Sequence, residues 1–501
     1  GKYIAKIDID NLKNTKAGKL ILVTSISPTI YGEGKTTTAI GLVDALNKLD
    51  KNAVAILREP ALGPVFGTKG GATGGGCAKV IPSDDINLYF TGDMSAICTA
   101  NNLLCAIIDN HIFQGNELKI KKVVLPRTID INDRALRNIT INSSYNREDH
   151  FILTVASELM ACVCLANDFK ELKEMVANMI VAYNDTGKPI YTKDLQAVEA
   201  VCILLKDVIK PNVVQTLEHN LAIIHGGPFA NIAHGTASIR AIKTGLENFS
   251  YSVVEAGFGS DLGAEKFFDI VCPKGDFYPD VIILNATIRA LKYNGQGNLK
   301  EGLANLQVHI DNMKLFAKNI IVSLNKFNDD TIEDINTIKE YVLKQGLEFA
   351  INDTYLKGSA GGLELGKKVV LLSNLDNKNS FKFNDNMKIK EKIMLLAKNI
   401  YHAKDVLYNA TAEDKIKLLE KLNLDRYPIC VSKTPMSISD NKELLGYPKD
   451  YTMQVTDIKL NNGAGFIVIY MGNVITLPGL SKESNYLKMH IDDDMHIEGV
   501  M

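Results

Sequence analysis

The sequence has no tryptophan, no long apolar run and no marked excess of charge of either sign. Its 501 residues carry a net charge of −2, so nothing indicates the basic surface that binds nucleic acid or an anionic membrane. No apolar run approaches the roughly 18 residues that a membrane span needs. The first residues also lack the apolar segment of a secretory signal. These absences predict a cytoplasmic protein with neither a nucleic acid nor a membrane as partner.

Cysteine is scarce and irregularly spaced. The eight cysteines form no C-x-x-C pair, and Cys162 and Cys164 have no further ligands at a spacing that suits zinc. We therefore expect buried thiols in a reducing compartment. Apolar residues make up 46% of the chain and charged residues 23%, as in a typical globular enzyme, and this length predicts roughly two to four domains.

The most informative stretch is 20–46. An apolar run predicts a strand, the residues after position 34 predict a helix, and the loop between them ends in Gly34-Lys35-Thr36. This matches the phosphate-binding motif G-x-x-x-x-G-K-[ST], except that Thr29 replaces the first glycine. The N-terminus of such a helix binds phosphate through its N–H groups and dipole. Lys35 would contact the outer phosphates, and Thr36 would bind the Mg²⁺ that accompanies ATP. We predict an ATP site, rather than a chance turn, formed by Thr29, Gly32, Glu33, Gly34, Lys35, Thr36 and Thr37.

Further polar residues follow the next predicted strand, at 52–57. Arg58 and Glu59 would reach the same sheet edge as Lys35, because ligands bind beyond the carboxyl ends of parallel strands. The planar guanidinium of Arg58 suits a phosphate or a small carboxylate. The glycine-rich stretch 63–76, which also contains Lys69, would let the backbone approach a ligand closely.

Three more polar residues stand near predicted element ends. Asp93 follows a Thr-Gly turn, where it either orients a catalytic group or caps the next helix, and the local pattern alone favours capping. His225 and His234 flank a glycine turn without an evident third ligand, so positioning roles are favoured over a metal site.

The order of elements predicts an α/β fold. Apolar strands at 222–225, 253–256, 281–287 and 320–325 end in polar or glycine residues, with helical patterns between them. This is typical of a P-loop NTPase-like, doubly wound, mostly parallel sheet. Residues 151–165 and 169–183 are predicted to be helical. The predicted domains are a large nucleotide-binding domain (1–93 with 251–324), a mostly helical second domain (94–250) and a C-terminal α/β domain (325–501).

Several motifs resemble one known family. Residues 66–76 and 286–295 are similar to signatures of the formate–tetrahydrofolate ligases (10-formyltetrahydrofolate synthetases), and the likeness extends over nearly the whole chain. It also covers 28–38, 57–64, 225–235 and 255–269. The resemblance implies a P-loop large domain with two smaller domains, a homotetramer, and activation by a monovalent cation, K⁺ or NH₄⁺.

The resemblance also implies a two-step reaction of one-carbon metabolism. Formate would attack the γ-phosphate of ATP to give formyl phosphate and ADP, and the amine of tetrahydrofolate would then attack the formyl carbon and release phosphate. Lys35 would hold the transferring phosphoryl group, Arg58 and Glu59 would lie at the formyl phosphate, and Asp93 would be a carboxylate of the active-site rim.

Two aromatic residues complete the predicted site. Phe327 and Tyr355 match the family's positions for holding the folate ring, and a flat ring system binds well between aromatic faces.

Two other functions remain open at the level of the sequence. Residues 32–37 also fit a P-loop switch or partitioning-type ATPase, which would not require formate. Tyr31 in the loop, with shortened segments elsewhere, fits a drifted family member that keeps the fold without catalysis.

Overall fold

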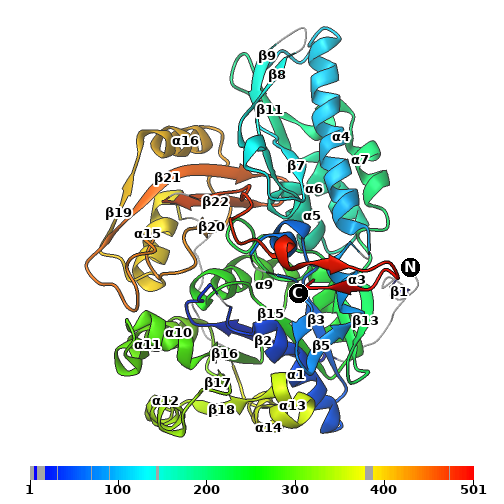
Figure 1. The fold of residues 1–501 in the computed structure, drawn as a ribbon. Coiled ribbons are helices and arrows are strands. Elements are labelled where there is room, and N and C mark those ends of the chain that lie inside the picture. The colour runs from blue at the N-terminus through cyan, green and yellow to red at the C-terminus, as the bar shows by residue number, and fades with distance from the viewer. Residues whose placement is uncertain are drawn as a thin grey trace.

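The computed structural model describes residues 5–7, 17–30, 32–68, 70–89, 91–142, 146–377, 387–472 and 474–500. Tyr31 and Lys69 lie outside the described residues. Eleven strands of the described chain form one large mixed sheet, with smaller sheets above and beside it (Figure 1). The α/β class predicted from the sequence is confirmed.

The large sheet is mostly parallel. Its order is β18 (Glu348–Asn352), β17 (Ile320–Asn325), β16 (Val281–Ala286), β2 (Lys19–Ser25), β15 (Tyr251–Glu255), β3 (Ala53–Leu57), β14 (Leu221–Ile224), β13 (Asn212–Thr216), β5 (Ala78–Ile81) and β4 (Gly74–Gly75), with β1 (Ala5–Lys6) also paired to β13. The strands from β18 to β14 run parallel, and the pairings of β13, β5, β4 and β1 are antiparallel.

The central strands are apolar because helices cover both of their faces. In β2, Ile21 and Val23 pack on one side with α1 (Lys35–Lys48) and α14 (Leu363–Leu372), while Leu20 and Leu22 pack on the other. Strands buried on both faces need nearly continuous apolar sequence, which is why the pattern predicted them correctly. The helices of the second face are α8 (Ile239–Asn248), α10 (Ile288–Asn294), α11 (Leu299–Phe316) and α12 (Ile332–Lys344).

The other elements extend from this sheet. Those between residues 62 and 205 are α2 (Leu62–Phe66), α3 (Ser83–Asn87), α4 (Asp93–Phe113), β6 (Ile120–Val123), β7 (Arg127–Ile129), β8 (Ile139–Asn142), β9 (Asn146–Asp149), β10 (Phe151–Leu153), α5 (Glu158–Leu165), α6 (Phe169–Ala177), β11 (Ile180–Asn184), β12 (Pro189–Tyr191) and α7 (Val198–Leu205). The later ones are α9 (Cys272–Gly275), α13 (Thr354–Lys357), α15 (Ile389–Asn399), β19 (Asp405–Tyr408), α16 (Ala410–Lys421), β20 (Ile429–Ser432), β21 (Thr452–Asn461), β22 (Phe466–Met471), β23 (His490–Ile491) and β24 (Ile497–Glu498). β19, β21, β22 and β20 form a four-stranded sheet, and β12, β11 and β6 a three-stranded one.

Two helical predictions are partly wrong. Residues 151–165 begin with strand β10, and α5 starts only after Ser157, whose Oγ accepts a hydrogen bond from the Met160 N–H at 3.1 Å. Residues 169–183 form α6 and then β11, because the apolar run from Ile180 pairs with β6 and β12. The stretch 94–250 therefore contains strands beside its helices.

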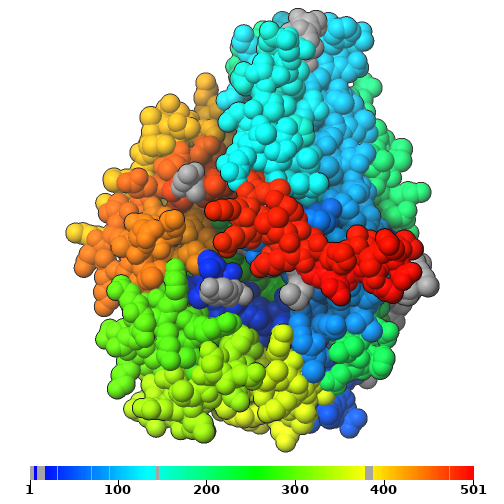
Figure 2. Space-filling view, in the orientation of Figure 1, coloured from blue at the N-terminus to red at the C-terminus, as the bar shows by residue number. Residues whose placement is uncertain are grey.

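The large sheet draws β13 and β14 from 94–250 and β18 from 325–501, while the domain boundaries themselves stay a prediction. Figure 2 shows the last residues of the chain, in red, lying across the front of the molecule. No helix among the described residues combines the length and apolar character that crossing a membrane needs.

Candidate active site

Three neighbouring parallel strands, β2, β15 and β3, bring charged residues to one edge of the sheet. Lys35 begins the helix after β2, Glu255 is the last residue of β15, and Arg58 directly follows β3. Because β15 lies between the other two strands, its terminal carboxylate lies between the two cations. This edge is where parallel sheets bind ligands.

Lys35 has the surroundings of a residue that binds anions. Its Nζ donates a hydrogen bond to Ser25 Oγ at 3.2 Å. Burial lowers the pKa of Lys35, while the Glu255 and Glu33 carboxylates favour the charged ammonium. The helix that Lys35 begins has no side-chain cap, so its first N–H groups remain available to phosphate oxygens.

Glu255 is a candidate site residue that the sequence did not predict. The Thr36 hydroxyl donates to its Oε2 at 2.7 Å, and its Oε1 lies 3.8 Å from Arg58 Nε. The Glu255 side chain is only 2% exposed. In the sequence, Glu255 lies at the end of a predicted strand and precedes a glycine-rich segment, which could have marked it as a site residue. Only the order of the strands shows that it lies between Lys35 and Arg58.

The loop before α1 is held by hydrogen bonds to Glu33, both from within the loop and from neighbouring segments. Glu33 accepts hydrogen bonds from the Thr29 N–H at 2.7 Å and the Thr29 hydroxyl at 2.9 Å, and its other oxygen accepts one from Thr287. The Glu33 carbonyl accepts from Asn285 Nδ2 and Asn325 Nδ2. Thr29 and Glu33 therefore fix the shape of the loop that leads into Lys35.

Arg58 and His234 form a second polar group at this edge. His234 is fully buried, and neither of its ring nitrogens has a hydrogen-bond partner among the described residues. Burial, with Arg58 and Lys266 adding to it, lowers the pKa of His234 to about 3, so the imidazole is neutral. His225 instead bonds to Ser238 and to the Val208 carbonyl.

Glu59 and Asp93 are buried neighbours. Glu59 accepts a hydrogen bond from the Thr91 hydroxyl, and Asp93 accepts from Lys6 Nζ at 2.8 Å and from Asn212 Nδ2 at 3.0 Å. Burial, followed by the charge of Asp93, raises the pKa of Glu59 well above its usual range, and burial also raises that of Asp93. Asp93 is the first residue of α4 and its side chain does not cap the helix, so the capping interpretation is wrong.

The predicted folate residues share a cavity with the loop before α1. A cavity of about 220 Å³ is lined by Gly32 and Gly34 of the loop, Thr37 of α1, and both Phe327 and Tyr355. Figure 2 shows the surface hollowed below the red C-terminal segment, with dark blue residues of the early chain in the hollow. The structure therefore brings the two predicted subsites together.

Two features of this cavity are absent from the sequence predictions. The Arg289 guanidinium lies 3.8 Å from the centre of the Phe327 ring, a cation–π contact that covers one face of that ring. The glycine-rich stretch packs against Tyr355: the Cys77 N–H donates to the Tyr355 carbonyl at 2.8 Å, and a side chain at Gly76 would collide with that carbonyl.

No disulfide and no cluster of metal ligands is found among the described residues of the site. All eight cysteines are free, and the described residues contain no group of three or more His, Cys, Asp or Glu side chains that could hold a metal ion.

The fold defines an α/β protein in which charged residues gather at the carboxyl edge of a parallel sheet. The family model for formate–tetrahydrofolate ligase matches residues 1–501. A formate–tetrahydrofolate ligase of Caldicellulosiruptor saccharolyticus is 51% identical over 519 residues, covering 99% of this chain and 94% of that protein. The chain belongs to the formate–tetrahydrofolate ligase family, which confirms the resemblance and the enzyme class predicted from its motifs.

Proposed function

We propose that the protein joins formate to tetrahydrofolate in an ATP-dependent reaction of one-carbon metabolism, giving 10-formyltetrahydrofolate, ADP and phosphate. Membership of the family supports the reaction. The observation that carries the assignment of the site is the convergence of Lys35, Arg58 and Glu255 on one sheet edge, beside the cavity that contains Phe327 and Tyr355.

The first step transfers a phosphoryl group to formate. A formate oxygen attacks the γ-phosphorus of ATP, the bond to the ADP oxygen breaks, and formyl phosphate forms. Such a transfer depends on positioning and on neutralising charge. The Lys35 ammonium and the N-terminus of α1 stabilise the phosphoryl oxygens, and Arg58 binds the formyl phosphate through its planar fork.

The residues present suit magnesium with ATP as the substrate complex. Thr36 and Glu255 offer a hydroxyl and a carboxylate that are already 2.7 Å apart, and oxygen ligands of this kind are those that Mg²⁺ prefers. Thr36 would bind the ion directly, while Glu255 would orient Thr36.

In the second step the folate amine attacks the formyl carbon and phosphate leaves. Phe327 and Tyr355 hold the flat ring of the folate, with Arg289 fixing the Phe327 ring from its other face. Glu59 and Asp93 complete the catalytic set. The Glu59 N–H donates to the Gly226 carbonyl at 2.7 Å, which fixes the backbone that carries Arg58.

Four finer features belong to the same proposal: activation by K⁺ or NH₄⁺, a homotetramer, a cytoplasmic location, and the three domains with boundaries at 93, 250 and 324. The family resemblance supports the first two, and free thiols suit a reducing compartment.

The test is an assay of ADP release by the purified protein with ATP, Mg²⁺ and K⁺. We expect release that requires both formate and tetrahydrofolate. Release without formate would favour a switch-type ATPase. Calorimetry that shows no tight, magnesium-dependent ATP binding would favour a drifted scaffold, since tight binding argues against it.

A further inference from the structure

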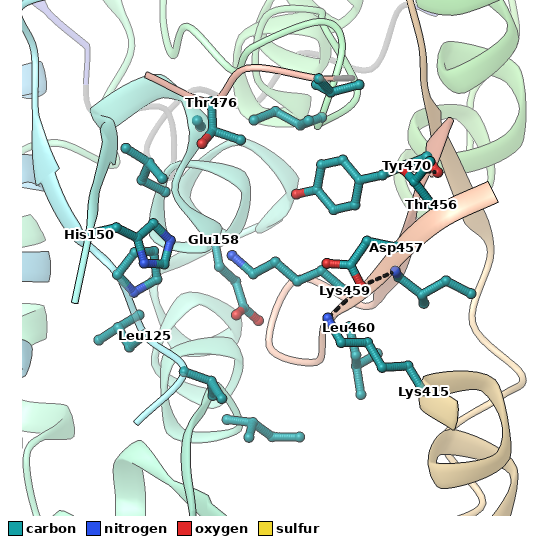
Figure 3. Close-up of a pocket in the computed structure, with 18 of the residues that line it drawn as sticks. Leu125, His150, Glu158, Lys415, Thr456, Asp457, Lys459, Leu460, Tyr470 and Thr476 are labelled. Atoms are coloured by element: carbon teal, nitrogen blue, oxygen red, sulfur yellow. Dashed lines mark hydrogen bonds and ion pairs between the residues drawn. The ribbon is translucent and has the colours of Figure 1, made fainter. Parts of the chain in front are cut away.

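A large cavity lies away from the predicted active site. It has a volume of about 830 Å³ and lies between the β6–β11 side of the molecule and the β21–β22 sheet with α16 (Figure 3). None of the residues assigned above to ATP, formate or folate lines it. Its size is in the range of sites that enclose small organic molecules.

The walls of the cavity are mainly apolar. Aliphatic side chains come from both sides, and they are Val123, Val124, Leu125, Ile152, Ile180, Ile232, Leu418, Leu419, Ile458, Leu460 and Val474. Such walls favour the apolar body of a ligand, because contact with them removes apolar surface from water.

Two ionisable side chains face each other inside these walls. Figure 3 shows Lys459 of β21 and Glu158 of α5 extending toward one another across the cavity. Lys459 pairs with Val468 through the backbone of the sheet, and its ammonium makes no hydrogen bond or ion pair with a described residue. Glu158 Oε1 accepts from the Gly463 N–H at 2.7 Å and the Ala464 N–H at 3.4 Å, while no described residue donates to Oε2. An ammonium and a carboxyl oxygen are therefore both available to a ligand.

The remaining charges leave the cavity with a positive excess. Lys415 Nζ lies 2.5 Å from Asp457 Oδ1, so the charges of these two side chains cancel. Burial, and then the charge of Lys459, lower the pKa of His150, so this imidazole is neutral. Lys459, with Lys122 on the lining, then outweighs Glu158, and the site favours an anion.

We propose that this cavity binds a small organic carboxylate, with its head group between Lys459 and Glu158 and its apolar body against the aliphatic walls. One carboxylate oxygen accepts from the Lys459 ammonium, and the other accepts from Glu158 when Glu158 carries a proton. Charge-assisted bonds of this kind are about twice as strong as neutral ones.

The assignment carries a pH dependence. Burial raises the pKa of Glu158 to about 7, and burial lowers that of Lys459. Rising pH therefore ionises Glu158, which repels the ligand, and favours neutral Lys459, so both changes weaken binding. The titratable and charged groups around Glu158 lie on several elements. They are Lys459 and Asp457 on β21, Tyr470 on β22, Lys415 on α16, Lys122 on β6, His150 before β10, Tyr183 on β11, Cys162 on α5 and Tyr427 before β20.

The test is calorimetric titration of the full-length protein with octanoate and with neutral octanamide. We expect octanoate to bind about tenfold more tightly than octanamide, because only the acid engages Lys459 as an anion. The Lys459→Met variant should remove this preference, and octanoate binding should weaken as the pH is raised from about 6 to about 8.5. Lys417→Met is the matched control, since this lysine of α16 is 71% exposed and does not line the cavity.

Three results would overturn the proposal: equal affinity of the wild-type protein for the acid and the amide, unchanged octanoate affinity in Lys459→Met, or displacement of octanoate by saturating ATP, formate and tetrahydrofolate. The comparison of acid with amide needs no variant, so it holds even if Lys459→Met fails to fold. Displacement by substrates would place octanoate in the active site, whereas failure of the ligase assay would leave this cavity unaffected.

Discussion

At the scale of the residue, we expect Lys35 to contribute strongly to catalysis and little to stability. Its ammonium makes one hydrogen bond, of 3.2 Å, and in the proposed reaction it would stabilise charge that develops on a phosphoryl group. We expect Lys35→Ala to lower kcat/KM by roughly 10²–10³ with little change in Tm. Lys48→Ala, at the exposed other end of α1, is the control and should keep turnover. Near-normal kcat/KM in Lys35→Ala would contradict the role assigned to it.

Glu59 gives a pH-dependent prediction. Burial and Asp93 raise its pKa well above the usual range. The Glu59 carboxyl therefore ionises at a lower pH in the unfolded chain than in the folded protein. As a result, the free energy of unfolding falls as the pH rises above the ordinary pKa of the carboxyl. We expect Glu59→Gln to raise Tm over wild type at about pH 8 and much less at about pH 5, while turnover falls.

The control for this experiment is Glu117→Gln, at an exposed position. Thermal unfolding of the three proteins across the same pH range gives the answer. A Glu59→Gln shift in Tm that is independent of pH would show that the carboxyl does not resist ionisation in the folded protein.

At the scale of the element, the loop before α1 contains two glycines that differ in the space available for a side chain. Gly32 and Gly34 both have positive φ, at 76° and 70°. A side chain at Gly32 would meet nothing within 4 Å, whereas one at Gly34 would lie 2.3 Å from Asn325 Nδ2. Gly32→Ala should therefore cost only the backbone strain of about 1–2 kcal/mol.

Gly34→Ala should cost more, because Asn325 must move and its hydrogen bond to the Glu33 carbonyl, 3.3 Å long, is lost. We expect Gly34→Ala to weaken MgATP binding much more than Gly32→Ala, in calorimetric titrations read beside the Tm of each variant. Equal losses in the two variants would mean that strain alone, and not the contact with Asn325, governs the loop.

The elements also show what a sequence can and cannot predict. The buried strands β2, β3, β16 and β17 were predicted because their apolar runs are a local property. Strand β11 was read as helix because its partners β6 and β12 are separate segments that local sequence does not identify.

In the candidate site, too, the local motif was predicted, whereas residues joined only by the fold were not. The loop with Lys35 is a local motif and was found. Glu255 was missed because its contacts with Thr36 and Arg58 follow from the order β2–β15–β3. Arg289 was missed because it lies on α10, whereas Phe327 lies in the loop after β17, a separate segment of the chain.

At the scale of the whole molecule, the large sheet and the four-stranded sheet are joined by a buried ion pair. Lys433 follows β20, and its Nζ lies 2.7 Å from Asp261 Oδ2, in the segment after β15. Both side chains are at most 1% exposed. The Lys433 N–H also donates to Asn231 Oδ1 at 3.0 Å, so this junction links the four-stranded sheet to the loops around Arg58.

Breaking this pair should destabilise the whole protein. Lys433→Met leaves the Asp261 carboxylate buried without its cation, which typically costs roughly 3–5 kcal/mol, whereas replacing both partners costs less. We therefore expect urea unfolding to show a large loss for Lys433→Met and partial recovery when Asp261→Asn is added. Lys318→Met, which breaks an exposed pair with Asp376 at 3.5 Å, should cost less than about 1 kcal/mol. Losses of similar size for Lys433→Met and Lys318→Met would show that the buried pair does not hold the two sheets together.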